Sequence, residues 1–171
     1  GRYGHMTVAP DGRILMSYSG NNTIYAIPAA GGAASVYLSG SPLNGPVGIA
    51  YDDAGNLIVL NYYGQSITRV KPDKTMEVVV RWTNGNPRTI VRQGDAWLVG
   101  TTSGVYRYNA NWQGERLLTE QSDGVELLDD GTIVTGNGAT LISRLVPQTI
   151  NGTAKIASYT TAIGKATSWL L

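Results

Sequence analysis

The sequence predicts an all-β fold made of small antiparallel sheets that follow one another along the chain. The first observation is the composition: the 171 residues include 22 glycines and 10 tyrosines, while only 15% of residues are charged. A composition of this kind favours strands and turns. The second observation is that no segment shows a capped helical period, and the third is a motif that recurs along the chain.

Two sequence landmarks recur with the same phase. A turn centred on glycine returns at intervals of 43, 39 and 37 residues, at Gly12, Gly55, Gly94 and Gly131. An alternating apolar segment returns at intervals of 43, 38 and 37 residues, starting at Ile24, Ile67, Val105 and Ile142. Because two independent landmarks keep step, the sequence predicts a unit of about 40 residues that occurs four times.

Each unit is predicted to form four short antiparallel strands. In the second unit the strands are expected over residues 47–52, 57–61, 67–71 and 76–80, where apolar and β-branched residues alternate. Polar tips are expected between the second and third strands, at residues 18–22, 61–65, 101–104 and 136–139. Four strands in a unit of this length are typical of propeller blades and not of a helical solenoid.

The units are assigned to residues 6–46, 47–87, 88–122 and 123–163 of one propeller or partial-propeller domain spanning residues 6–171. Residues 1–5 resemble the remnant of a tag, and residues 164–171 are expected to add a strand of the innermost kind. Both ends then offer inner strands, so they cannot complete each other's blade. Three explanations stay open: a fragment or half-propeller completed by a second chain, a four-bladed ring with an irregular end, or a different structure at the end.

Charge and residue types exclude several classes of function. A formal net charge of +1 gives no general attraction to nucleic acid or to anionic membranes, and no apolar run is long enough for a membrane span. The absence of cysteine excludes disulfides and thiolate chemistry, and a single histidine, His5, excludes a Ser-His-Asp triad or a multi-histidine metal site. The compartment stays open, with an extracellular, periplasmic or virion setting slightly favoured.

The stretch "GPVGIAYDDAGNLIVLNYYGQSITRVKPDKTMEVV" resembles an NHL repeat of the broader six-bladed propeller group. That group includes the SMP-30/gluconolactonase-like lactonases and the streptogramin-lyase-like enzymes. The resemblance is carried by Pro46, by the turn at Asp52–Asn56 and by the segment Ile67–Val70. It implies a ring of about six blades, so that four units would leave an open arc. We therefore expect association with another chain, either a second copy or a protein partner.

In propellers, the loops that enter the innermost strands and the tips between second and third strands line one rim of the central channel, and loops on a rigid scaffold commonly bind ligands. Tyr, Trp and Asn side chains suit recognition of a protein or a glycan. Alternatively, the Asn residues serve turns and the Trp residues pack between blades. The binding candidates are Tyr62, Tyr63, Trp82, Asn84, Asn86, Arg88, Asp123 and Glu126.

A non-enzymatic binding and assembly module without a cofactor is the first expectation. The alternative implied by the resemblance is a lactonase in which Asp123, Glu126 and Asn86 hold a divalent cation such as calcium. The family's diagnostic Asn-Asp motif is missing, and lyase chemistry needs a histidine base that this chain does not have to spare.

Arginines recur at one position of the third strand, at Arg69, Arg107 and Arg144. They predict either a basic stripe for nucleic acid or a solvated strand face with ion pairs between blades. The second reading is preferred because the positions lie far from the channel and are a blade apart.

Overall fold

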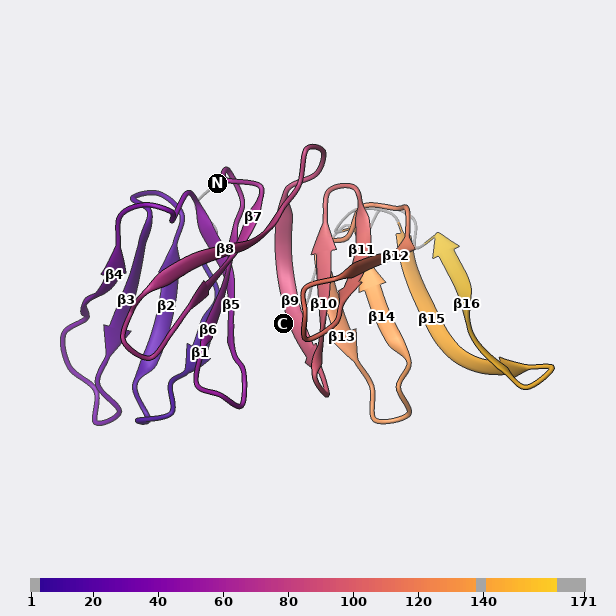
Figure 1. The fold of residues 1–171 in the computed structure, drawn as a ribbon, viewed down its shortest axis with the longest axis horizontal. Helices are drawn as coiled ribbons and strands as arrows, with labels where there is room; N and C mark the ends of the chain where they lie inside the picture. The colour runs from indigo at the N-terminus through magenta and orange to yellow at the C-terminus, as the bar shows by residue number, and fades with distance from the viewer. Residues whose placement is uncertain (1–3, 138–140, 163–171) are drawn as a thin grey trace.

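The computed structural model describes residues 4–137 and 141–162. Within these residues it contains sixteen strands and no helix, and the strands form four antiparallel sheets of four strands each (Figure 1). The predicted all-β fold of about four propeller-type blades is confirmed. The strand expected over residues 164–171 lies outside the described residues.

The strands follow the chain in groups of four. Sheet 1 consists of β1 (Met6–Val8), β2 (Ile14–Tyr18), β3 (Thr23–Ile27) and β4 (Ser35–Ser39). Sheet 2 consists of β5 (Pro46–Tyr51), β6 (Leu57–Asn61), β7 (Ser66–Val70) and β8 (Met76–Arg81). Sheet 3 consists of β9 (Pro87–Gln93), β10 (Ala96–Thr101), β11 (Gly104–Tyr108) and β12 (Gly114–Leu118). Sheet 4 consists of β13 (Gly124–Leu127), β14 (Ile133–Gly136), β15 (Leu141–Ile150) and β16 (Thr153–Ala162).

The turn between β5 and β6 shows why these residues form a hairpin. Gly55 adopts φ +78°, a left-handed conformation that glycine reaches without strain. Its backbone N–H donates to the carbonyl of Asp52 at 3.1 Å. The Asp52 carboxylate accepts the backbone N–H of Asn56 at 2.7 Å, so side chain and backbone close the same turn.

Apolar residues from facing sheets form three separate clusters, one at each junction. Between sheets 1 and 2 the cluster includes Leu15, Ile24, Ile49 and Val59. Between sheets 2 and 3 it includes Ile58, Ile67, Ile90 and Val99. Between sheets 3 and 4 it includes Leu98, Val105, Val125 and Ile133. The core is therefore divided into layers, and each inner sheet contributes one face to each of two layers, as in stacked repeats.

The four sheets follow one another in chain order, with sheet 1 at one end and sheet 4 at the other (Figure 1). Polar contacts also cross the junctions: the Ser17 hydroxyl donates to the carbonyl of Val47, from sheet 1 to sheet 2. The hairpin of β15 and β16 has ten residues in each strand and extends beyond the other strands (Figure 1).

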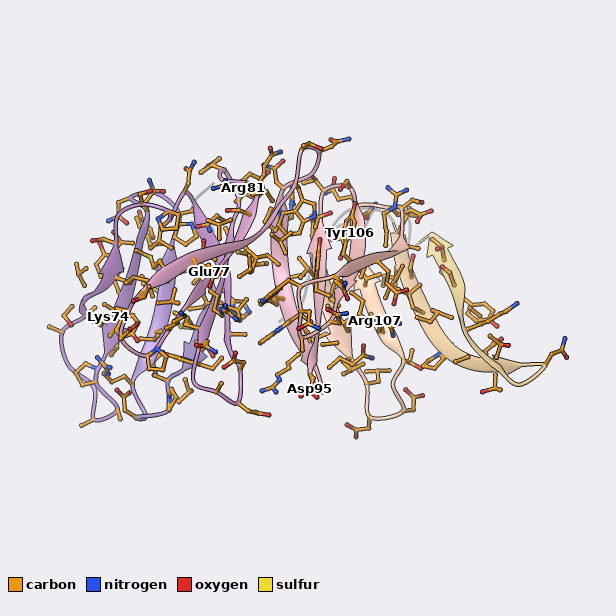
Figure 2. The ribbon with its side chains drawn as sticks, in the orientation of Figure 1. Lys74, Glu77, Arg81, Asp95, Tyr106 and Arg107 are labelled. Carbon is orange, nitrogen blue, oxygen red and sulfur yellow. The ribbon has the colours of Figure 1, made fainter. Side chains whose placement is uncertain are left out.

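The expected ion pairs between blades at the recurring arginines are wrong for two of the three positions. Arg69 Nη2 lies 2.7 Å from Glu77 Oε2, and Arg107 pairs with Glu115, in both cases within one sheet. The strand register places each arginine directly opposite its partner on the neighbouring strand, and opposite residues are the nearest neighbours on a sheet face. Figure 2 labels Glu77 of sheet 2 and Arg107 of sheet 3.

Candidate functional site

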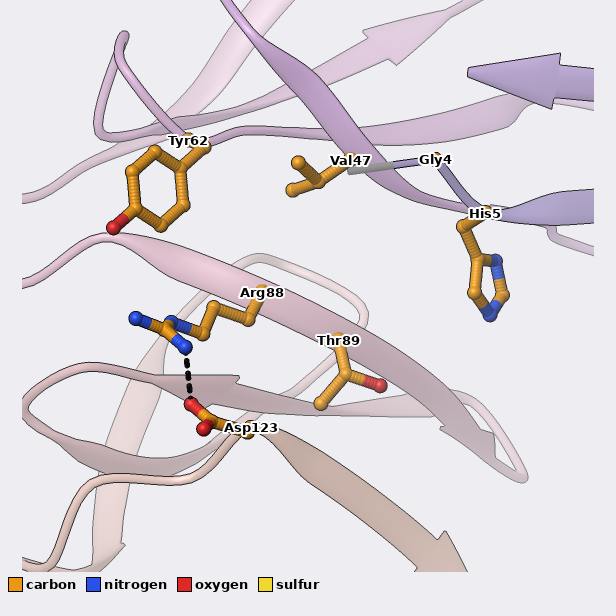
Figure 3. A pocket seen from close by; sticks show the side chains of 7 residues that line it. All are labelled: Gly4, His5, Val47, Tyr62, Arg88, Thr89 and Asp123. Atoms are coloured by element: carbon orange, nitrogen blue, oxygen red, sulfur yellow. Dashed lines mark hydrogen bonds and ion pairs between the residues drawn. The ribbon is translucent and has the colours of Figure 1, made fainter. Parts of the chain in front are cut away.

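A cavity of about 380 Å³ lies where the first strands of the sheets come together (Figure 3). Its walls include residues at or just before β1, β5, β9 and β13, and one residue that follows β6. In a closed propeller the first strands border the central channel, so this cavity is called the channel-side cavity. The lining residues are Gly4, His5, Val47, Tyr62, Arg88, Thr89 and Asp123.

Arg88 is the central polar group of this cavity. Its Nη1 lies 2.5 Å from Asp123 Oδ1, which joins sheet 3 to sheet 4. Its guanidinium carbon lies 5.7 Å from the centre of the Tyr62 ring, a cation–π distance. The side chains of Arg88 and Asp123 are 25% and 30% exposed, so the pair is only partly shielded from water. Figure 3 shows the guanidinium between the ring and the carboxylate.

The hydrogen bonds of this pair leave some capacity unused. Asp123 Oδ1 accepts a second hydrogen bond, from Gln121 Nε2 at 2.9 Å. Arg88 Nε is buried and has no hydrogen-bond partner in the protein. A buried donor without a partner is costly. The arrangement offers a planar donor, a carboxylate acceptor and an aromatic face within one small space.

His5 lines the same cavity, although it lies in the segment 1–5 that was expected to be the remnant of a tag. Its Nδ1 lies 3.3 Å from the carbonyl oxygen of Ile49, and its backbone N–H donates to Ser17 Oγ at 2.9 Å. The signal that could have found it is its place one residue before Met6 of the first strand, which matches the place of Thr89, another lining residue, before Ile90.

Of the eight binding candidates, the structure brings Tyr62, Arg88 and Asp123 together. Tyr63 is 57% exposed and meets Tyr62 edge-on, with ring centres 5.2 Å apart. Asn86 acts as a brace: its Nδ2 donates to the carbonyl of Tyr62 at 2.8 Å. Asn84 accepts a hydrogen bond from the Ser103 hydroxyl at 3.3 Å through its backbone carbonyl.

Trp82 belongs to the packing between sheets 2 and 3. Its ring centre lies 6.4 Å from that of Tyr106 and 5.9 Å from that of Tyr108, both edge-on. Burial raises the pKa of Tyr108 to about 12. The alternative reading, in which tryptophan packs between blades, describes this residue.

The three residues considered for a divalent cation do not converge. Asp123 is engaged by Arg88 and Gln121, and Asn86 turns its amide nitrogen to a backbone carbonyl. Val125 faces sheet 3 in the core, so the next residue, Glu126, projects from the opposite side of β13. Among residues 4–137 and 141–162, no three His, Asp or Glu side chains are grouped so that they could hold a metal ion. This donor set does not fit the cation that the resemblance implies.

A second arginine–carboxylate pair lies at the other end of β9. Arg92 donates to both carboxylate oxygens of Asp53, at 2.5 and 2.7 Å, which joins sheet 3 to sheet 2. Its guanidinium carbon lies 5.8 Å from the Trp97 ring centre. The pair resembles Arg88 and Asp123 in chemistry but does not line the cavity. In the described part of the chain, no helix is long and apolar enough to cross a membrane.

No protein-family model matches the chain, and no curated protein matches it either. Among solved structures, streptogramin B lyase superposes with a TM-score of 0.72 at 21% identity, covering 90% of this chain and 53% of that one. Virginiamycin B lyase from Staphylococcus aureus gives 0.70 at 17% identity, covering 90% and 54%. A gluconolactonase from Xanthomonas campestris gives 0.73 at 14% identity, covering 93% and 62%.

The chain thus spans about half the length of the two lyases that it matches. At these identities the likeness is one of fold, and fold does not assign activity. The four sheets and the structural neighbours together show a propeller-type fold, which streptogramin B lyase and the gluconolactonase share.

Proposed function

We propose that the chain is a non-enzymatic propeller module, with NHL-like blades, that binds a protein or glycan ligand in the channel-side cavity and works within an assembly. The observation that supports this most directly is the joining of Arg88, Asp123 and Tyr62 at one cavity. Arg88 lies in β9, and Tyr62 and Asp123 each lie one residue outside a strand, after β6 and before β13. Anchoring to strands holds the geometry of a site better than a free loop does.

A glycan fits this cavity better than an extended peptide. A volume of about 380 Å³ lies at the small end of the range for ligand pockets. Sugar hydroxyls both donate and accept, which matches a guanidinium beside a carboxylate, and the Tyr62 ring offers a flat apolar face. The formal net charge of +1 favours no strongly charged partner.

The test is a screen of the 171-residue chain against an array of immobilised glycans, followed by titration calorimetry with the best binder. We expect Arg88→Gln to weaken binding by about tenfold or more, because a hydrogen bond from a charged group is lost. Arg92→Gln is the matched control, since it removes an arginine–carboxylate pair of the same chemistry outside the cavity.

Two results would contradict the glycan proposal. The first is an array without a binder, and the second is equal weakening by Arg88→Gln and Arg92→Gln. Binding that is instead found with a protein partner, and that is lost with Arg88→Gln alone, would assign the same cavity to a protein side chain.

A lactonase is the second candidate, favoured by the likeness in fold to a gluconolactonase and by an acidic residue, Asp123, in the channel-side cavity. It is tested by hydrolysis of sugar lactones with and without calcium or zinc, and by the melting temperature in each cation. A marked rise in melting temperature that Asp123→Asn abolishes would support this candidate. No response to millimolar cation, together with no hydrolysis, would remove it.

A further inference from the structure

The two end sheets leave equivalent repeat positions uncovered. On the first strand of each sheet, one apolar residue faces the preceding sheet and pairs with the corresponding second-strand residue. These residues are Met6, Ile49, Ile90 and Val125. Their exposed fractions are 63%, 0%, 3% and 3%. This first-strand position is therefore buried in sheets 2, 3 and 4, whereas in sheet 1 no sheet of the described residues covers it.

The mirror situation holds in sheet 4. On the third strand of each sheet, one residue faces the following sheet: Ile24, Ile67, Val105 and Ile142. The first three are fully buried, whereas Ile142 is 37% exposed. A side chain that forms the core in three repeats is open in the fourth because no sheet follows it within the described residues.

Exposed apolar residues gather on these two surfaces. Among the described residues, eight large apolar side chains are exposed. Four lie on the uncovered face of sheet 1, here called the sheet 1 end face: Met6, Val8, Ile14 and Val36. Two lie on the uncovered face of sheet 4, the sheet 4 end face: Ile142 and Tyr159. Only Tyr63 and Leu128 lie in loops. Clustered exposure of this kind marks an interaction surface.

The three junctions inside the molecule show how a face of this kind is covered by a neighbouring sheet. At every junction the third-strand residue of one sheet shares a core cluster with the first-strand residue of the next. The pairs are Ile24 with Ile49, Ile67 with Ile90, and Val105 with Val125. By the same geometry, the sheet 4 end face fits the surface that presents Met6. On the sheet 4 end face, Val134 pairs with Glu126 on one neighbouring strand and with Arg144 on the other, and these two residues carry opposite charges.

We propose that the sheet 4 end face of one copy packs on the sheet 1 end face of a second copy, and that the second pair of faces closes the ring. The described residues of two copies supply eight sheets, within the range of four to eight blades that propellers adopt. The chain matches 53% of the length of streptogramin B lyase and 62% of that of the gluconolactonase, so two copies supply at least the length of such a ring. The inference rests on the part of the proposed function that places the chain in an assembly, and it does not depend on which ligand the cavity binds.

The test is the mass of the full chain in solution, measured by light scattering over a range of concentrations. We expect a mass twice that of the 18.2 kDa chain. Met6→Glu and Ile142→Glu should each give the single-chain mass, because a buried unpaired charge disfavours the contact. Leu128→Glu is the matched control: this exposed apolar residue lies in a loop and its substitution should leave the doubled mass unchanged.

Mixing the two variants tests the head-to-tail arrangement. A mixed pair places both substitutions in one contact and leaves the other contact intact, so pairs should form again in the mixture. Circular dichroism should be unchanged, because both side chains are exposed, and Val8→Glu with Tyr159→Glu provides a second set.

Three results would overturn the inference. They are a single-chain mass for the unmodified protein at every concentration, a mass that grows without limit with concentration, and no pairing in the mixture. Glycan binding that persists in a chain of single mass would leave the proposed ligand site standing, so the two failures are distinguishable.

Discussion

Arg92 holds Asp53 through both carboxylate oxygens, at 2.5 and 2.7 Å, and this pair ties sheet 3 to sheet 2 at the end of β9 farthest from the cavity. The hydrogen bond and charge of Arg92 lower the pKa of Asp53 below its usual value of 3.8. A carboxyl group whose pKa is lower in the folded state stabilises the fold above the unfolded pKa, and this contribution is lost as pH falls through the folded pKa.

The first prediction concerns this acid dependence. Asp53→Asn should lower the urea midpoint slightly at about pH 6, and this effect should fade as the pH falls through the folded pKa, because the carboxyl group then becomes protonated in both states. The effect should be small because the Asp53 side chain is 87% exposed. A loss of stability that stays the same as the pH falls would contradict an ionic contribution.

The second prediction concerns the packing of sheet 3 on sheet 4. A Cβ at Gly100 would lie 2.6 Å from Ser122 Oγ and 2.7 Å from Thr89 Cγ2. Gly100→Ala should therefore cost about 1–3 kcal/mol of unfolding free energy, as overpacking does. Gly124→Ala is the control, since nothing lies within 4 Å of its added Cβ. Urea denaturation of both variants gives the comparison, and an equally stable Gly100→Ala protein would show that the sheets are farther apart.

The third prediction concerns alkaline pH. Burial raises the pKa of Tyr108 from 10.0 to about 12. Its protonated form therefore stabilises the fold fully below the unfolded pKa, and the contribution is lost as pH rises through the folded value. In a spectroscopic titration of the tyrosines, Tyr108→Phe should remove one late-ionising phenol. Loss of an early-ionising phenol instead would place Tyr108 in contact with water.

Local pattern was sufficient to predict the four strands of the second unit. The second unit was predicted to have strands at residues 57–61 and 67–71, and the structure has β6 at Leu57–Asn61 and β7 at Ser66–Val70. Such strands can be predicted because their signals, apolar alternation and turn residues, extend over only a few neighbouring positions. The regular spacing of the alternating apolar segments also singled out Ile24, Ile67 and Val105, and these three residues are fully buried at the junctions between sheets.

The cavity was predicted only in part, because its geometry depends on which face of a strand each side chain leaves. Asp123 and Glu126 are close in sequence, yet only Asp123 reaches Arg88 and the cavity. Similarly, Arg69 meets Glu77 because of the register between β7 and β8, which spacing along the chain does not specify. His5 was missed because its role comes from tertiary contacts with Ser17 and Ile49.

The most direct measurement of the central claim, that the two end faces are halves of one junction, is disulfide trapping between separate chains. The protein has no cysteine, so single substitutions report unambiguously. A mixture of Met6→Cys and Ile142→Cys chains should form covalent pairs on mild oxidation, because these positions are expected to share a core cluster and a disulfide requires close Cα atoms. Met6→Cys mixed with Leu128→Cys should remain uncoupled. No covalent pair in the first mixture, or equal coupling in both, would contradict the account.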